Sequence, residues 1–151
     1  MTVAMHPAPD FTHAWEEIKA RNLDEAERIF AEAAQADPSL ADAWNGLGAV
    51  QFERGDLESS LSFYRKAHAA AVAAHGGRLP KRLAWNEQDK PALRAIHGIG
   101  LNHFRAGRFA EAKKEFELLL ALNPDDNQGA RFMLKDIAGK ADLWKRDADT
   151  D

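Results

Sequence analysis

Histidine is the residue type that first suggests chemistry in this sequence. The chain of 151 residues has six histidines and no cysteine, so a bound zinc ion would depend on imidazole and carboxylate ligands. The histidines closest along the chain are six or seven residues apart, in the pairs His6/His13, His68/His75 and His97/His103. Two helical turns separate such rings by about 10 Å, too far for one zinc ion with Zn–N bonds of about 2.0 Å. We therefore expect these histidines to lie on the surface or to pack, and a metal-dependent enzyme is only a remote alternative.

Other motifs of catalysis and cofactor binding are missing from the sequence. It contains no G-x-x-x-x-G-K-[ST] phosphate loop and no G-x-S-x-G nucleophile elbow, and the GIG at 98–100 lies within a helical pattern. The carboxylates are scattered along charged helices, whereas catalysis needs groups that converge in one pocket. The sequence therefore predicts a protein that is not an enzyme and holds no cofactor.

The elements that position the remaining side chains form a threefold internal repeat. A shift of 34 residues aligns Ala14, Ile18, Ala26 and Phe30 with Gly48, Phe52, Ser60 and Tyr64. A shift of 52 residues aligns this second set with Gly100, Phe104, Ala112 and Phe116. Similarity at a fixed spacing is typical of a stacked repeat architecture, and the larger second shift indicates an insertion of 18 residues.

Each copy has the apolar periodicity of two helices on either side of a short break. The breaks lie at Arg21-Asn22, Gly55-Asp56 and Gly107-Arg108. Antiparallel helices that cross at about 8–10 Å need small side chains at the contact. We therefore expect Ala14, Gly48 and Gly100 to face Ala26, Ser60 and Ala112, with Phe30, Tyr64 and Phe116 filling the space between hairpins.

The second copy carries a pattern that resembles a known family. It has W-x-x-L-G at 44–48, Gly55-Asp56 at the break and S-x-x-x-Y-x-x-A at 60–67. This pattern resembles the tetratricopeptide repeat, a helical hairpin of 34 residues that stacks into a right-handed superhelix. The runs LNPDDNQGARFMLKDI and WNEQDKPALRAIHGIGL also resemble segments of small bacterial tetratricopeptide proteins whose role is not established.

The resemblance implies an all-α fold, an α-solenoid of three hairpins followed by a C-terminal capping helix. We expect a single domain over 1–151, with repeats at about 10–38, 41–75 and 90–124, an insertion at 76–89 and the capping helix at about 126–138. The expected N-capping side chains are Asp10 for the first helix, Gln88 or Asp89 for the fifth, and Asp125 or Asp126 for the last. In the insertion, we expect Leu83 and Trp85 to fold back onto the extended helix that precedes them, with contact to a ligand as the alternative.

In the family, the first helix of each hairpin lines a concave groove, which implies a site for a peptide or helix of another protein. The candidate partner-binding residues are therefore Phe11, Trp15, Lys19, Asn45, Phe52, Arg94, His97, Leu101 and Arg105, with Arg131 and Lys135 from the final helix. Phe104 is a further candidate, although it and Phe52 could equally belong to the core. Relatives that grip the C-terminal carboxylate of a chaperone use Lys, Asn and Arg at places where this chain has Phe11, Trp15, Gly46, Arg94 and Gly98. Since only Arg94 matches, we predict no chaperone-tail clamp.

Charge is divided unevenly along the chain. Residues 10–63 contain 12 acidic and 4 basic residues, whereas residues 78–114 contain 9 basic and 3 acidic ones. The basic half favours an acidic peptide, and the two opposite halves leave self-association into a homo-oligomer as an alternative function. Nucleic acid is not an expected partner, because the pI is about 5.9 and nucleic-acid-binding domains usually exceed about 9.

Nothing in the sequence predicts a membrane segment. No apolar run approaches the ~20 residues that span a bilayer, and the start MTVAMHPAPD lacks the features of a signal peptide. We therefore expect no membrane partner and a location in the cytoplasm.

Overall fold

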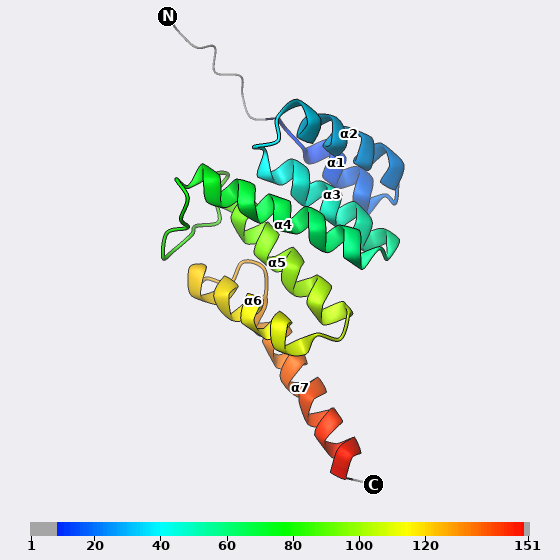
Figure 1. Cartoon of the computed structure of the whole chain (residues 1–151), viewed down its shortest axis with the longest axis vertical. Coiled ribbons are helices and arrows are strands. Elements are labelled where there is room, and N and C mark those ends of the chain that lie inside the picture. The colour runs from blue at the N-terminus through cyan, green and yellow to red at the C-terminus, as the bar shows by residue number, and fades with distance from the viewer. Residues whose placement is uncertain (1–8, 150–151) are drawn as a thin grey trace, which may run out of the picture.

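The computed structural model describes residues 9–149, with side chains described as far as residue 140, and seven α-helices make up this range (Figure 1). The helices are α1 (Thr12–Lys19), α2 (Leu23–Ala36), α3 (Ala41–Arg54), α4 (Leu57–Ala74), α5 (Lys90–Arg105), α6 (Phe109–Leu122) and α7 (Ala130–Asp149). Successive helices pair as the hairpins α1–α2, α3–α4 and α5–α6, and α7 packs against α6. The expected α-solenoid of three hairpins with a C-terminal helix is confirmed. His6 lies outside the described residues.

The breaks within the hairpins depend on left-handed backbone. Gly55 has φ 83° and Gly107 has φ 81°, a conformation that glycine adopts without steric cost. In the first hairpin Arg21 takes this place with φ 68°, although it is not glycine. Its guanidinium donates to Glu53 Oε2 of the next hairpin at 2.5 Å, so the side chain at this break links hairpins one and two.

Small residues allow the two helices of a hairpin to approach closely. Ser60 Oγ donates to the Gly48 carbonyl at 2.7 Å, so the predicted contact between these two positions is confirmed. A Cβ added to Gly48 would lie 2.8 Å from the Tyr64 ring, and one added to Gly100 would lie 2.8 Å from the Phe116 ring. The aromatic rings of the second helices therefore pack on the glycines of their own hairpins.

Two further glycines, which the repeat comparison did not single out for packing, set the spacing between hairpins. A Cβ added to Gly46 would overlap the Phe30 ring of hairpin one, and a Cβ added to Gly98 would overlap the Tyr64 ring of hairpin two. Phe30 and Tyr64 therefore fill the space between one hairpin and the next, as predicted. Each ring requires a glycine on the first helix of the following hairpin.

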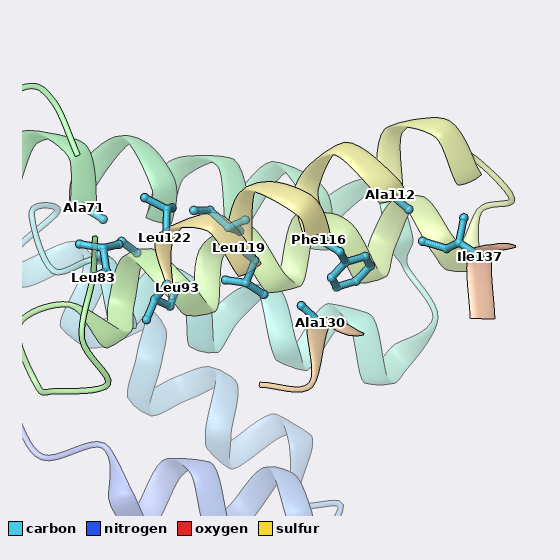
Figure 2. Close-up of a cluster of buried hydrophobic side chains, with 12 residues drawn as sticks. Ala71, Leu83, Leu93, Ala112, Phe116, Leu119, Leu122, Ala130 and Ile137 are labelled. Carbon is cyan, nitrogen blue, oxygen red and sulfur yellow. The ribbon is translucent and has the colours of Figure 1, made fainter. Parts of the chain in front are cut away.

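The buried side chains form two clusters. The N-terminal cluster lies between hairpins one and two and contains Ala14, Ala26, Phe30, Ala34, Ala43, Leu47 and Val50. The C-terminal cluster joins α4, the insertion, hairpin three and α7, and contains Ala71, Leu83, Leu93, Ile96, Phe116, Leu119, Leu122 and Ile137 among others (Figure 2). Each cluster thus stabilises a different part of the solenoid.

A buried polar chain crosses the middle of the solenoid and connects α3, α4 and α5. Besides its bond to the Gly48 carbonyl, Ser60 Oγ accepts from Asn102 Nδ2 at 2.9 Å. The same amide nitrogen donates to the Gly98 carbonyl at 3.0 Å. Because an unpaired polar group in this interior would cost free energy, the chain of hydrogen bonds fixes the relative positions of these helices.

The insertion returns to the core at one residue. The side chain of Leu83 is buried in the C-terminal cluster, and its backbone N–H donates to the Leu122 carbonyl at 2.8 Å. The prediction that Leu83 folds back is confirmed, whereas Trp85 remains 38% exposed. Asp89 occupies the N-cap position of α5, but its carboxylate accepts from Ala84 N at 2.9 Å and faces His75 Nε2 at 3.6 Å, so it braces the insertion instead of capping the helix.

The ends of the solenoid differ from the expected limits. The helix expected at about 126–138 begins at Ala130 and continues to Asp149. Asp126 has φ 56° and turns the chain, and its carboxylate accepts from the backbone of Ala130 and Arg131. At the other end, α1 begins at Thr12 and Phe11 occupies its N-cap position. The expected N-cap Asp10 therefore lies one residue too early, although its Oδ1 accepts from Thr12 N at 2.9 Å. None of the helices between residues 9 and 149 has the length and apolar character that a bilayer crossing requires.

Candidate partner-binding surface

The first helices of the three hairpins lie next to one another. α1 contacts α3, and α3 contacts α5, so side chains from residues far apart in sequence share one surface. We call this surface the first-helix face. It is where the repeat pattern predicts partner-binding residues.

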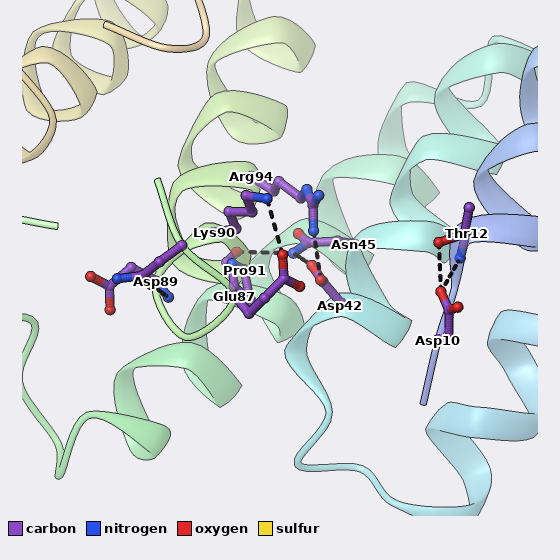
Figure 3. Close-up of polar contacts among 10 residues, drawn as sticks. Asp10, Thr12, Asp42, Asn45, Glu87, Asp89, Lys90, Pro91 and Arg94 are labelled. Atoms are coloured by element: carbon purple, nitrogen blue, oxygen red, sulfur yellow. Dashed lines mark hydrogen bonds and ion pairs between the residues drawn. The ribbon is translucent and has the colours of Figure 1, made fainter. Parts of the chain in front are cut away.

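Arg94 is the centre of the most elaborate group on this face. Its Nη1 donates to Asp42 Oδ2 at 2.6 Å, joining α5 to α3 (Figure 3). Its guanidinium carbon lies 5.6 Å from the ring centroid of Trp15 on α1 and 5.9 Å from that of Trp85 in the insertion. Trp15, Asp42, Trp85 and Arg94 therefore form one group, the aromatic–arginine cluster, in which cation–π attraction supplements the ion pair.

The aromatic–arginine cluster remains accessible to a partner. The side chain of Arg94 is 30% exposed and that of Asp42 is 21% exposed. Lys90 Nζ lies 5.3 Å from the Trp85 ring and donates to Glu87 Oε1 at 3.1 Å, adding a second cation beside the cluster. Beside Asp42 a cleft of about 240 Å³ opens, lined by Phe11, Leu40, Glu87 and Pro91 among others.

A second cation–aromatic pair lies further along the first-helix face. The guanidinium carbon of Arg105 lies 4.9 Å from the Phe52 ring centroid, and its Nη1 donates to the Phe52 carbonyl at 3.3 Å. Phe52 is half-buried and Arg105 is exposed, so this pair also joins α3 to α5 at the surface. Lys19, on α1, is exposed as well.

Asn45 requires a correction. We expected it to contact a partner, but its side chain is fully buried. Its Nδ2 donates to Asp42 Oδ1 at 3.0 Å and to the Pro91 carbonyl at 2.9 Å. Asn45 therefore orients the carboxylate that holds Arg94 and attaches the start of α5 to α3.

Several other candidate side chains are partly buried against neighbouring residues of the protein instead of extending into solvent. Phe11 and Trp15 are half-buried, with their ring centroids 5.2 and 5.0 Å from that of Phe30. Leu101 is half-buried against the C-terminal cluster. Phe104 packs edge-on against Phe109 at 5.6 Å, so it belongs to the contact between α5 and α6.

The three remaining candidates lie on α5 and α7. His97 is half-buried, and its ring lies 5.8 Å from that of Phe116. Arg131 and Lys135 are exposed on α7, where Arg131 faces Asp126 Oδ2 at 3.5 Å. The contacts in the described part of the chain do not bring these three residues to the aromatic–arginine cluster.

The burial of His97 predicts a dependence of stability on pH. Desolvation lowers the pKa of His97, and the nearby Asp126 carboxylate opposes this shift only in part. Below the ordinary histidine pKa of about 6.5, the His97 side chain therefore takes up a proton in the unfolded chain but resists it in the folded chain. The free energy of unfolding consequently decreases as the pH is lowered. We expect H97F, which keeps a ring beside Phe116, to lose less free energy of unfolding than the wild type between about pH 7.5 and about pH 5.5 in urea titrations. Equal losses in the two proteins would contradict this expectation.

In the part of the chain that the structure describes, no three His, Asp or Glu side chains lie close enough together to hold a metal ion.

Family comparison agrees with the hairpin geometry. A model of the tetratricopeptide repeat matches residues 11–74, and a second model of this repeat matches residues 94–126. The two ranges together cover more than half of the chain. The chain belongs to the tetratricopeptide repeat family. Tetratricopeptide repeats generally mediate protein–protein interactions and are typically not catalytic. No curated protein matches this sequence.

In this tetratricopeptide repeat protein the insertion lies between the two matched ranges. It supplies Trp85, which the sequence analysis did not place on the first-helix face. The signal for this role was a large aromatic side chain in the loop shortly before α5, in the run LAWNEQDK at 83–90. The face on which Trp85 lies depends on the backbone hydrogen bond between Leu83 and Leu122, which are far apart in sequence.

Proposed function

We propose that this tetratricopeptide repeat protein is a non-catalytic cytoplasmic adaptor that binds an acidic peptide or helix of a partner protein on its first-helix face. The observation that carries this proposal is the aromatic–arginine cluster, which brings α1, α3, α5 and the insertion together around one guanidinium. Trp85 supplies an exposed apolar anchor beside that cation, and aromatic and arginine side chains dominate the energetics of protein interfaces.

Arg94 has the chemistry to receive a carboxylate from a partner. A guanidinium has five N–H donors, and the hydrogen bond found for Arg94 within the described residues uses one of them, toward Asp42. Asp42 and the flanking tryptophans hold the guanidinium in place, which reduces the entropy lost on binding. Arg105 and Lys90 add positive charge on the same face, so a segment with spaced carboxylates and an apolar side chain fits best.

The test is a selection of peptides followed by titration. A random-peptide display library is selected on the full chain, and a selected peptide is titrated by fluorescence anisotropy against R94E, R105E and the control K114E. Lys114 is an exposed cation on α6, away from the first-helix face. We expect acidic peptides with an apolar anchor, at least about tenfold weaker binding to R94E, and a change below about twofold for K114E.

Peptides without an excess of Asp and Glu would contradict the proposed partner chemistry. Equal binding to the wild type, R94E and R105E would contradict the proposed face. Circular dichroism and urea unfolding of each variant separate these outcomes from loss of the fold.

A further inference from the structure

A long apolar depression lies on the side of the solenoid formed by the second helices. Two hollows of about 730 and 610 Å³ adjoin there and share Pro38 and Trp44. The larger is lined by Ala31, Leu47 and Phe63 among others, and the smaller continues along α4 past Ala69 and Ala73. We call the two together the α2–α4 trough.

The floor of the α2–α4 trough is held in place by the fold. Trp44 Nε1 donates to the Pro38 carbonyl at 2.8 Å, which fixes the indole. The Trp44 and Phe63 rings stack with centroids 6.1 Å apart and planes at 20°. A rigid aromatic floor of this kind can receive an apolar side chain without first being ordered.

The two walls of the trough carry opposite charge. On the α2 side the larger hollow is lined by Asp24, Glu27 and Arg28, while Glu25 and Glu32 lie on the same helix outside the lining. Arg54 pairs with Asp24 and Glu27, and Arg28 pairs with Glu25 and Glu32, so four carboxylates and two guanidiniums leave the α2 side acidic in the described chain. On the α4 wall, Lys66 Nζ lies 4.9 Å from the Trp44 ring centroid. Among the described residues Lys66 has no carboxylate partner within ion-pair distance. An occupant that matches both walls needs a basic group on one side of an apolar anchor and an acidic group on the other.

The outer face of α7 has this composition. Phe132 is 80% exposed, the most exposed of the large apolar side chains in the described part of the chain. Lys135 and Asp136 are also exposed, and neither takes part in an ion pair between residues 9 and 140. Positions three and four residues after Phe132 lie one turn along the helix, on either side of the line through Phe132 parallel to the axis. The positive and the negative group therefore diverge from the phenyl ring toward opposite sides.

We propose that the α7 face formed by Phe132, Lys135 and Asp136 docks into the α2–α4 trough of a second copy of this chain. Phe132 lies on the floor beside Phe63, Lys135 faces the acidic α2 wall, and Asp136 faces Lys66. The trough lies between α2 and α4. Helices α2 and α7 lie toward opposite ends of the molecule (Figure 1), so the contact is head-to-tail. Each contact leaves a trough and an α7 face unoccupied, which allows a chain or a closed ring of copies. The contact is separate from the first-helix face and does not depend on the proposed peptide binding.

The first experiment measures the association of the full chain. Sedimentation velocity is recorded from micromolar to millimolar concentration, with F132S and the control L118S, which removes another exposed apolar side chain. We expect the average mass of the wild type to rise with concentration and F132S to lower the association constant by at least about tenfold, while L118S changes it less than about twofold. A wild type that stays monomeric throughout, or equal association by F132S and the wild type, would overturn the proposal.

A second experiment tests which faces meet. K66E and D136K each place like charges opposite one another in a contact between identical copies, so each should associate less than the wild type. A mixture of the two restores opposite charges at every contact between unlike copies. The glutamate in the trough of K66E then meets the lysine on α7 of D136K, and Lys66 of D136K meets Asp136 of K66E. We expect mixing to restore association toward the wild-type level. If the mixture associates no better than the separate variants, the proposed pairing is wrong.

Discussion

Replacing Gly46 by alanine is expected to destabilise the protein by about 3 kcal/mol or more. The added Cβ would overlap the Phe30 ring, closer than any carbon–carbon contact allows. Phe30 is fully buried and is itself held by Phe11 and Trp15, so the ring has no free space to enter. Hairpins one and two must therefore separate, and urea unfolding of G46A measures the cost.

A matched control exists in the same chain. Gly139 is also a helical glycine, but an added Cβ there would meet nothing within 4 Å. G139A is therefore expected to stabilise the protein by up to about 1 kcal/mol through helix propensity. G98A should resemble G46A, since its Cβ would overlap the Tyr64 ring. If G46A, like G139A, left the free energy of unfolding unchanged or raised it, Phe30 would be able to move aside.

The repeat comparison contained the signal for the glycine contacts between hairpins, although their role was not predicted. The shift of 52 residues aligns Gly46 with Gly98, and the shift of 34 aligns Thr12 with Gly46. Gly46 and Gly98 each face an aromatic ring of the hairpin before them. Thr12, in the first hairpin of the described residues, is exposed, so no ring of a preceding hairpin packs on it there. The contacts within hairpins were easier to predict, because a short break fixes how its two helices meet.

The candidate site was predicted less completely than the fold. Periodicity places Trp15, Arg94 and Arg105 on first helices, and the structure joins each of them to another element of this face. Periodicity does not fix the rotation of each helix closely enough to distinguish Asn45, which is buried, from Asp42, which lies one turn earlier and is partly exposed. The place of Trp85 depends on the loop that Leu83 anchors. The α2–α4 trough depends on the stagger of two hairpins, which no local pattern encodes.

The two buried clusters give the second large expected effect. F30A and F116A each remove a fully buried phenyl ring, one from the N-terminal and one from the C-terminal cluster. Phe-to-Ala changes in a core cost about 3–5 kcal/mol, because lost burial and a cavity add together. F132A removes the same side chain from an 80% exposed position and is expected to change the free energy of unfolding by less than about 0.5 kcal/mol in dilute solution.

Amide hydrogen exchange should show where each core substitution acts. Apart from the contact between Trp15 and Arg94, which joins hairpins one and three, the helix contacts in this solenoid run between neighbouring hairpins, so a cavity weakens the nearest interface first. F30A should therefore lower protection most in α1 and α2, and F116A most in α6 and α7, with the Gly48–Ser60–Asn102 chain of hydrogen bonds holding α3, α4 and α5 together in both variants. If either variant lowered protection equally in all seven helices, the solenoid would unfold as one unit and the two clusters would be a single core. Unequal loss would instead mean that the α7 end and the α2 end can open separately, so ligand binding at one end need not stabilise the other.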